Sequence, residues 1–365
     1  MRANPRQLVL LDEEEADRAN RWREQNLVRN PFETQDDGTP LFRAHVPDAV
    51  YLAGWLKRAL SEQAVPPLVI KGAIGNGKTH WLRAFEHDAR VRLGEHGVVS
   101  YRHLTEVSMK NLSLGGLMWS SLSELAREVI AAGGKSGLEP SSPIAAVLSR
   151  VSHQDGAAVD LAHRWLARGP LSKTDLSKIG ASGPLETEGQ WVAALADILL
   201  AARERLDFKV WLFLLDQLED LWRSNVITPV KRARFLTDLR ALIDRGRAGS
   251  PLAIALAWNT GQRREVEDQL KRDYIALFSR VERVVDIPKL PREQLVPFAR
   301  AYVVDAMDDR EEGSPLLAAL EQAEVGLTND LPPDGTTARE WLKRLHAWAE
   351  QPVWSPKPRT LRLKR

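Results

Sequence analysis

The chain of 365 residues contains no cysteine. Disulfide bonds and thiolate metal sites are therefore excluded, which fits a reducing cytosol. Long apolar runs are missing too, because the most apolar stretches, 210–215 and 252–258, are far too short to span a bilayer. The first residues, Met1-Arg2-Ala3-Asn4-Pro5, carry no apolar signal-peptide core. We therefore expect a soluble, cytoplasmic protein that does not contact a membrane.

An excess of one charge is also absent. The 51 Lys and Arg residues nearly balance the 49 Asp and Glu residues, so the net charge of +2 does not indicate a nucleic-acid binder. The stretch 354–365 is the exception, because it carries five basic residues and no acid: Lys357, Arg359, Arg362, Lys364 and Arg365. This basic tail is either a solvated chain end or a contact for phosphate or an acidic partner.

The strongest motif is the octet at 72–79, Gly-Ala-Ile-Gly-Asn-Gly-Lys-Thr, which lies between a strand-like run at 68–70 and a helical segment from Thr79 to about Leu93. Glycines let the backbone turn its N–H groups toward phosphates, and the helix N-terminus adds favourable partial charge. Lys78 would reach the β- and γ-phosphates, and the Thr79 hydroxyl would ligate Mg²⁺. The candidate nucleotide-binding residues here are Gly72, Gly75, Asn76, Gly77, Lys78, Thr79 and His80.

Strand and helix patterns alternate around this motif. Strands are expected at 68–70, 98–101, 209–215, 251–258 and 281–287, and helices at 6–30, 47–64, 79–93, 229–246 and 262–278. This alternation predicts an α/β P-loop fold, in which a mostly parallel sheet has helices on both faces.

The rest of the chain is mainly helical. Residues 105–207 carry many Gly, Ser and Pro breaks, and after Pro291 helical patterns recur at 292–308, 314–324 and 336–350. The expected domains are an N-terminal helix and linker at 1–46, a nucleotide-binding domain at 47–288 with a helical insertion at about 105–207, a small all-helical lid at 289–352 and a basic tail at 353–365.

An apolar strand at 210–215 ends in Asp216-Gln217-Leu218-Glu219-Asp220. A buried strand that delivers a carboxylate at its C-terminal end suits a magnesium-holding Walker B acid, so Asp216 is expected to bind the metal through water. The group that activates the attacking water is open between Glu219, as a base, and Gln217, which would orient water without deprotonating it. In the plainer alternative, Glu219 only caps or pairs with the following helix.

Three polar residues complete the series. Asn259 follows the strand at 251–258, where it would reach the γ-phosphate and its water or simply form a turn. Arg280, before the last strand, is either a finger for a neighbouring subunit's nucleotide or a surface residue, with Arg283 as its substitute. Arg339 stands in the first turn of a helix that Thr337 and Glu340 would cap; a cation opposes the helix dipole there, so it faces either a phosphate or a local acid.

This ordered set resembles the AAA+ ATPases over about residues 28–350. The resemblance implies ATP and Mg²⁺ as cofactors, and it makes Asn259 sensor 1, Arg280 the arginine finger and Arg339 sensor 2. Bacterial relatives of the origin-recognition ATPases, including those of transposition and BREX-like phage defence, look most similar. The Asn30-Pro31-Phe32 entry to a helix before the first strand is similar to theirs, and so is the stretch from Arg164-Trp165-Leu166 to Gly183-Pro184.

The Walker B segment departs from that pattern. Asp-Gln-Leu-Glu at 216–219 is similar to the segment of STAND-type signalling ATPases, and Gln217 stands where many such ATPases have Glu. No winged-helix domain is recognisable, so DNA contact would come from the insertion, the tail or a partner. We expect an ATPase that couples its cycle to assembly or remodelling of a protein–nucleic-acid complex, as a homo-oligomer or with a partner protein. The alternative is a slow nucleotide switch that recruits an effector; near-neutral charge disfavours a pure DNA-binding module.

Overall fold

The computed structural model describes residues 27, 31–32, 46–61, 64–107, 112–133, 137–151, 156–223, 227–260, 275–307, 314–329, 331–332 and 334–350. Apart from Leu27, the expected helix at 6–30 lies outside these residues, as do most of the expected helix at 262–278 and the basic tail. The chain divides into two compact units. The larger comprises Val46–Ile74 and Lys78–Ile287, and the smaller comprises Met1–His45, Gly75–Gly77 and Pro288–Arg365.

The larger unit is built on a five-stranded sheet with the order β2-β3-β4-β1-β5 among the described residues. Its strands are β1 (Leu68–Gly72), β2 (Gly97–His103), β3 (Val210–Asp216), β4 (Leu252–Asn259) and β5 (Arg283–Ile287). The pairings between these five strands are parallel. The expected α/β P-loop fold is therefore confirmed, and β4 alone separates the strand before the phosphate loop from the strand that ends in Asp216.

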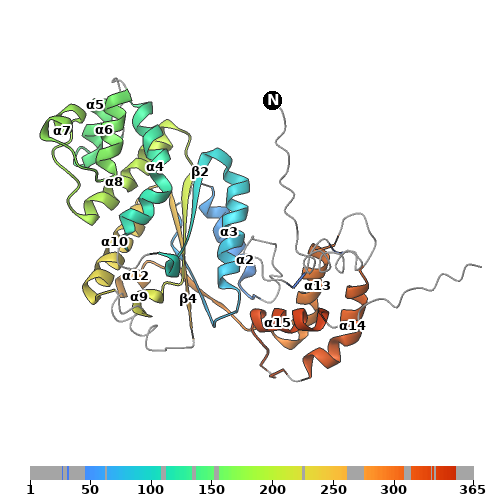
Figure 1. Ribbon diagram of the computed structural model, residues 1–365. Coiled ribbons are helices and arrows are strands. Elements are labelled where there is room, and N and C mark those ends of the chain that lie inside the picture. The colour runs from blue at the N-terminus through green and yellow to red at the C-terminus, as the bar shows by residue number, and fades with distance from the viewer. Residues whose placement is uncertain are drawn as a thin grey trace, which may run out of the picture. The chain divides into compact units, whose positions relative to one another are not determined.

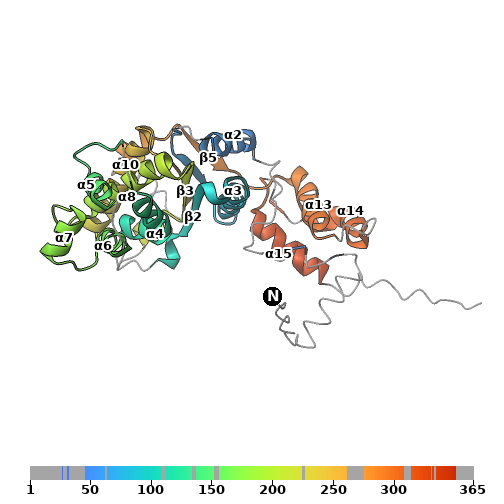
Figure 2. The same cartoon turned by 90° about the horizontal axis from the view of Figure 1, so that it is seen from above.

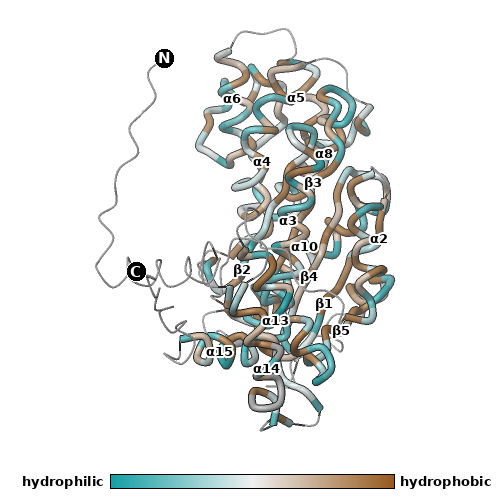
Figure 3. Tube along the Cα trace, turned by 90° about the vertical axis from the view of Figure 1, so that its right-hand side faces the viewer, coloured by the Kyte–Doolittle hydropathy of each residue, from teal (hydrophilic) through white to brown (hydrophobic). Residues whose placement is uncertain are grey.

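Helices cover both faces of this sheet (Figures 1 and 2). One face packs against α2 (Ala49–Ala59) and α3 (Lys78–Leu93), and the other against α4 (Leu114–Ala132), α8 (Glu188–Arg205) and α10 (Pro229–Arg247). The central strands are mostly hydrophobic (Figure 3), as expected for a parallel sheet buried on both sides.

Side chains along β3 alternate between the two faces. Leu212 and Leu214 belong to the core under α2 and α3, whereas Trp211 and Phe213 belong to the core under α4, α8 and α10. Because strand side chains repeat with period two, Asp216 continues the row of Leu212 and Leu214. The carboxylate therefore points to the side of the sheet where α3 begins.

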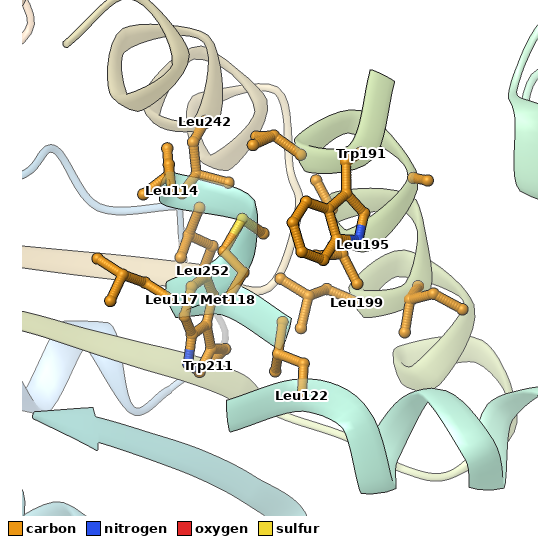
Figure 4. Close-up of a cluster of buried hydrophobic side chains, with 14 of the residues drawn as sticks. Leu114, Leu117, Met118, Leu122, Trp191, Leu195, Leu199, Trp211, Leu242 and Leu252 are labelled. Carbon is orange, nitrogen blue, oxygen red and sulfur yellow. The ribbon is translucent and has the colours of Figure 1, made fainter. Parts of the chain in front are cut away.

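Helices occupy the segment that was expected to be a helical insertion. Between α4 and α8 lie α5 (Pro143–Val151), α6 (Gly156–Leu166) and α7 (Lys173–Ile179). Figure 4 shows how α4 and α8 join the core, in a cluster of Leu114, Leu117, Met118, Leu122, Trp191, Leu195, Leu199, Trp211, Leu242 and Leu252. The Trp165 indole N–H donates to the Gly183 carbonyl at 2.8 Å, which links the two ends of the stretch that resembles origin-recognition relatives.

Short elements connect the larger ones. They are η1 (Gly94–His96), η2 (Leu104–Glu106), α9 (Asp220–Arg223), α12 (Ile275–Phe278) and η4 (Arg292–Gln294). The last strand begins at Arg283 rather than at the expected Val281, because the backbone first turns through Ser279 and Arg280. Of the helices that the structure describes, none has the length and apolar content needed to cross a membrane.

The smaller unit contains α13 (Leu295–Asp305), α14 (Pro315–Thr328) and α15 (Ala338–Ala349) around its own apolar core. Trp341 is buried at the centre of that core, and its indole N–H donates to the Leu295 carbonyl at 2.9 Å. Phe32 and Leu27 are buried in the same core. The motif expected to precede the first strand therefore contributes an aromatic anchor to the C-terminal helices.

Gly72 tests the register of β1 against β5. A Cβ atom at this position would lie 2.6 Å from the Ile287 carbonyl oxygen, which is backbone and cannot move aside. We expect Gly72→Ala to lower the free energy of unfolding by about 1–3 kcal/mol, as overpacking does. The matched control is Gly54→Ala in α2, where a Cβ meets nothing within 4 Å; it should stabilise by about 0.5–1 kcal/mol. Denaturant unfolding measures both, and equal midpoints would contradict the register.

Candidate nucleotide site

The phosphate loop has the backbone that its glycines predict. Gly75 and Gly77 have φ angles of 87° and 95°, in the region that disfavours any residue with a Cβ. The ammonium of Lys78, at the start of α3, donates to the carbonyl oxygens of Gly72 at 2.9 Å and Ala73 at 2.8 Å. Lys78 is buried, so its charge is held inside the loop where it would meet the phosphates.

The two expected metal ligands meet directly. The Thr79 hydroxyl donates to Oδ2 of Asp216 at 2.7 Å, although 137 positions separate them in the chain. Asp216 is 1% exposed and also accepts from the Gln217 backbone N–H at 2.8 Å, on Oδ1. Parallel pairing explains this meeting, because it brings the C-terminal ends of β1 and β3 to the same edge of the sheet.

These residues fit magnesium that arrives with a nucleotide. Mg²⁺ prefers oxygen ligands, keeps several waters, and is usually held by one or two carboxylates together with substrate phosphates. Thr79 and Asp216 supply one hydroxyl and one carboxylate at the end of the phosphate loop. Within the described part of the chain, no group of three or more His, Cys, Asp or Glu side chains could hold a metal independently.

Glu219 and Asn259 form a second pair at the same edge. One carboxylate oxygen of Glu219 accepts from the Asn259 backbone N–H at 3.1 Å, and the other accepts from the Asn259 side-chain amide. Glu219 is 3% exposed, and burial raises the pKa of its carboxyl, while the N–H donors act in the opposite direction. The carboxylate of this candidate base is therefore hydrogen-bonded to the last residue of β4 and is shielded from solvent.

Gln217, the other candidate for handling water, has a φ of 57°, an uncommon value for a residue with a side chain. The left-handed residue makes a tight turn, closed by a hydrogen bond from the Asp220 N–H to the Gln217 carbonyl at 3.0 Å. This turn sends Asp216 and Glu219 to different partners. The roles of Gln217 and Glu219 toward water stay predictions.

Both candidate arginine fingers are paired within the chain. Arg280 binds Asp244 of α10 through two nitrogens; one contact, Nη2 to Oδ2, measures 2.9 Å. This pairing raises the pKa of Arg280 and lowers that of Asp244. Arg283 pairs with Asp48 and lies 4.8 Å from the centre of the Tyr51 ring. The finger role of either residue stays a prediction.

Asn76, His80 and Arg339 are the remaining candidates, and the structure gives their local surroundings. Asn76 is buried in the loop, and His80 is half-buried in the first turn of α3. Arg339 is exposed in the first turn of α15, where the Thr337 hydroxyl accepts from the Glu340 N–H at 3.2 Å. The backbone N–H of Arg339 donates to the Gly75 carbonyl of the phosphate loop at 3.1 Å, within the same unit. The action of its guanidinium on a phosphate stays a prediction.

Sequence reasoning missed Tyr101 and Arg83. The Tyr101 hydroxyl donates to Oδ2 of Asp216 at 2.9 Å, and the Arg83 guanidinium lies 3.7 Å from the centre of the Tyr101 ring. Arg83 sits one helical turn after Thr79, which is a detectable spacing. Tyr101 carries no such signal, because its approach to Asp216 depends on the pairing of β2 with β3.

Compared by sequence, the chain matches no protein-family profile and no curated protein. By structure it is similar to the Aeropyrum pernix ORC1 protein in complex with DNA, at 13% identity and TM-score 0.46, covering 88% of this chain and 63% of that one. The Aeropyrum pernix ORC2 protein gives 14% identity and TM-score 0.46, with 87% and 71% covered. Domain III of the Thermotoga maritima replication initiation protein DnaA gives 12% and 0.33, with 86% and 100% covered.

The chain spans 63% of the ORC1 chain, and all three TM-scores are below 0.5. The functional argument therefore rests on the geometry of the site.

Asn259 allows a test of Glu219 as the base. Because its side-chain amide favours the charged carboxylate, Asn259→Ala should raise the pKa of Glu219 further above its usual value. A base must be deprotonated, so the acid limb of the single-turnover rate against pH should move to higher pH. Thr260→Ala, at the next position, is the control and should keep the wild-type limb. An unmoved limb in Asn259→Ala would exclude the carboxylate of Glu219 as its source.

Proposed function

We propose that the chain binds and hydrolyses ATP as an AAA+ protein and couples this cycle to assembly or remodelling of a protein–nucleic-acid complex of the mobile-element or phage-defence type. The hydrogen bond between Thr79 and Asp216 carries the proposal. A P-loop octet arises by chance in some chains, and apolar strands often end in Asp. Their meeting at 2.7 Å across 137 positions is what a phosphate loop and its Walker B acid require.

The residues divide the chemistry among themselves. Loop N–H groups and Lys78 would bind the phosphates, while Glu219 would take a proton from the attacking water or Gln217 would orient that water. Mg²⁺, held by Thr79 and Asp216, would neutralise phosphate charge. Catalysis of this kind consists mainly of positioning and electrostatic stabilisation. Closure of the helical lid through Arg339 would depend on which nucleotide is bound.

A slow nucleotide switch that recruits an effector is the second candidate, and the environment of Glu219 favours it. Both carboxylate oxygens of Glu219 already accept from Asn259, and burial raises its pKa. A base held in this way would act only after Asn259 releases it. Slow or partner-stimulated turnover would follow, in agreement with the resemblance of residues 216–219 to STAND-type ATPases.

Partners follow from the same proposal. Arg280 would complete a site in a neighbouring copy or a partner protein, which makes a homo-oligomer or a multi-component assembly the working form. Nucleic acid would be a further partner, through the helices α4–α8, the basic tail or another protein. We propose that the protein works in the cytoplasm, which supplies ATP. The lack of cysteine agrees with the reducing environment there.

Point variants test the enzyme directly. Lys78→Ala should abolish nucleotide binding, whereas Glu219→Gln should keep binding and lower turnover by about 10²–10⁴-fold, the usual contribution of a general base. Lys57→Ala, exposed on α2, is the control for charge loss and should behave as wild type. Equilibrium binding and steady-state phosphate release, each with and without DNA, supply the measurements. DNA-stimulated turnover supports the ATPase that assembles or remodels a protein–nucleic-acid complex, whereas tight ATP retention supports the slow nucleotide switch. Full turnover in Glu219→Gln would refute Glu219 as the base.

Mixed variants test whether sites are shared between copies. The Arg280→Ala protein keeps an intact phosphate loop but lacks the candidate finger. The Lys78→Ala protein keeps Arg280 but has a defective phosphate loop. If Arg280 reaches a neighbour's nucleotide, a mixture of the two should recover part of the turnover that each lacks alone. A mixture no more active than its components would argue for a site that is complete within one chain.

A further inference from the structure

The Asp216 carboxylate accepts three hydrogen bonds from the described residues. Among the described residues, its Oδ1 accepts from the Gln217 N–H, and its Oδ2 accepts from both the Thr79 and Tyr101 hydroxyls. A carboxylate offers about four lone-pair positions, and these three donors fill three of them. One accepting position therefore remains, on Oδ1.

Strand register delivers the third donor. On β2, His103 stands opposite Asp216 and Tyr101 opposite Leu214. Tyr101 therefore lies two residues before the level of Asp216 on the same face of the sheet, and its long side chain spans that distance. The regular pairing of β2 with β3 therefore brings the Tyr101 hydroxyl to the Asp216 carboxylate.

A cation holds the ring in place. The Arg83 guanidinium lies 3.7 Å from the centre of the Tyr101 ring, and Arg83 also pairs with Glu86 at 2.8 Å. A cation over an aromatic face is attracted by the ring's negative quadrupole. Because Arg83 follows Thr79 by one helical turn, α3 positions both the Thr79 hydroxyl and the ring that carries the Tyr101 hydroxyl.

The hydroxyl of Tyr101 is a permanent donor. A tyrosine hydroxyl ordinarily has a pKa of about 10 and therefore carries its proton at neutral pH. In this position the Tyr101 hydroxyl donates that proton to Oδ2 of Asp216 at 2.9 Å.

We propose that Tyr101 is a positioning residue for magnesium: it fixes the rotation of the Asp216 carboxylate and limits it to one metal-bound water. This inference rests on the proposed nucleotide site. Without the hydroxyl, Asp216 would lose one of three restraints and would offer a second accepting position. The carboxylate would then meet the metal with poorer geometry, although every ligand is still present.

The magnesium dependence of nucleotide affinity tests this role, with a fluorescent ADP analogue as the probe. Affinity is measured in EDTA and then across a magnesium titration, for wild type and Tyr101→Phe. The variant should match wild type in EDTA, whereas the magnesium concentration at the midpoint of the metal-dependent gain should rise about 10-fold or more, as for other residues that orient metal ligands. Tyr51→Phe, which removes a hydroxyl from α2 outside the site, should leave the midpoint unchanged.

Other outcomes are equally decisive. A magnesium midpoint in Tyr101→Phe equal to that of wild type overturns the inference and leaves the proposed function intact. A loss of EDTA affinity together with a lower unfolding temperature, without a midpoint shift, shows a purely structural role and overturns it as well. If wild type itself fails to bind the probe under any condition, the proposed function fails, and the inference fails with it.

Discussion

Parallel strand pairing is the constraint on which the rest of the site depends. The sheet order places β4 between β1 and β3, and all three strands end at one edge. Each therefore delivers polar groups to the same place: the phosphate loop from β1, Asp216 from β3 and Asn259 from β4. An antiparallel neighbour would reverse one of these ends and carry its side chain to the far edge of the sheet. The order and direction of the strands thus bring the polar residues of the site together, while the apolar interiors of the strands stabilise the fold.

The turn after β3 separates two carboxylates that would otherwise interfere. Like charges that share one site raise each other's pKa. With Gln217 in a left-handed conformation, Asp216 faces α3 and β2, while Glu219 contacts the end of β4. Two acids within four positions therefore have distinct partners. This geometry explains why the acid three positions after Asp216 reaches the end of β4, whereas position 217 lies in the turn.

Much of this arrangement could be predicted from the sequence, because the relevant signals are local. Glycines mark the loop, apolar runs mark the strands, and a polar residue at each strand end marks the edge. Contacts between residues far apart in the chain have no such local signal. No sequence spacing predicts that Tyr101 approaches Asp216 or that Arg280 pairs with Asp244. Likewise, nothing in Pro31-Phe32 indicates that Phe32 packs with helices that begin at Leu295.

The paired state of Arg280 remains compatible with a finger role once the energies are compared. Asp244 is 43% exposed, so water screens its attraction for Arg280. Partly exposed ion pairs contribute about 0–1 kcal/mol. An arginine finger that meets a phosphoryl transition state accelerates turnover by about 10³–10⁵-fold, which corresponds to several kcal/mol. If Arg280 acts as a finger, the phosphoryl transition state in a neighbouring site would therefore bind it more strongly than Asp244 does. In an isolated chain, Asp244 instead keeps the guanidinium ordered and satisfied.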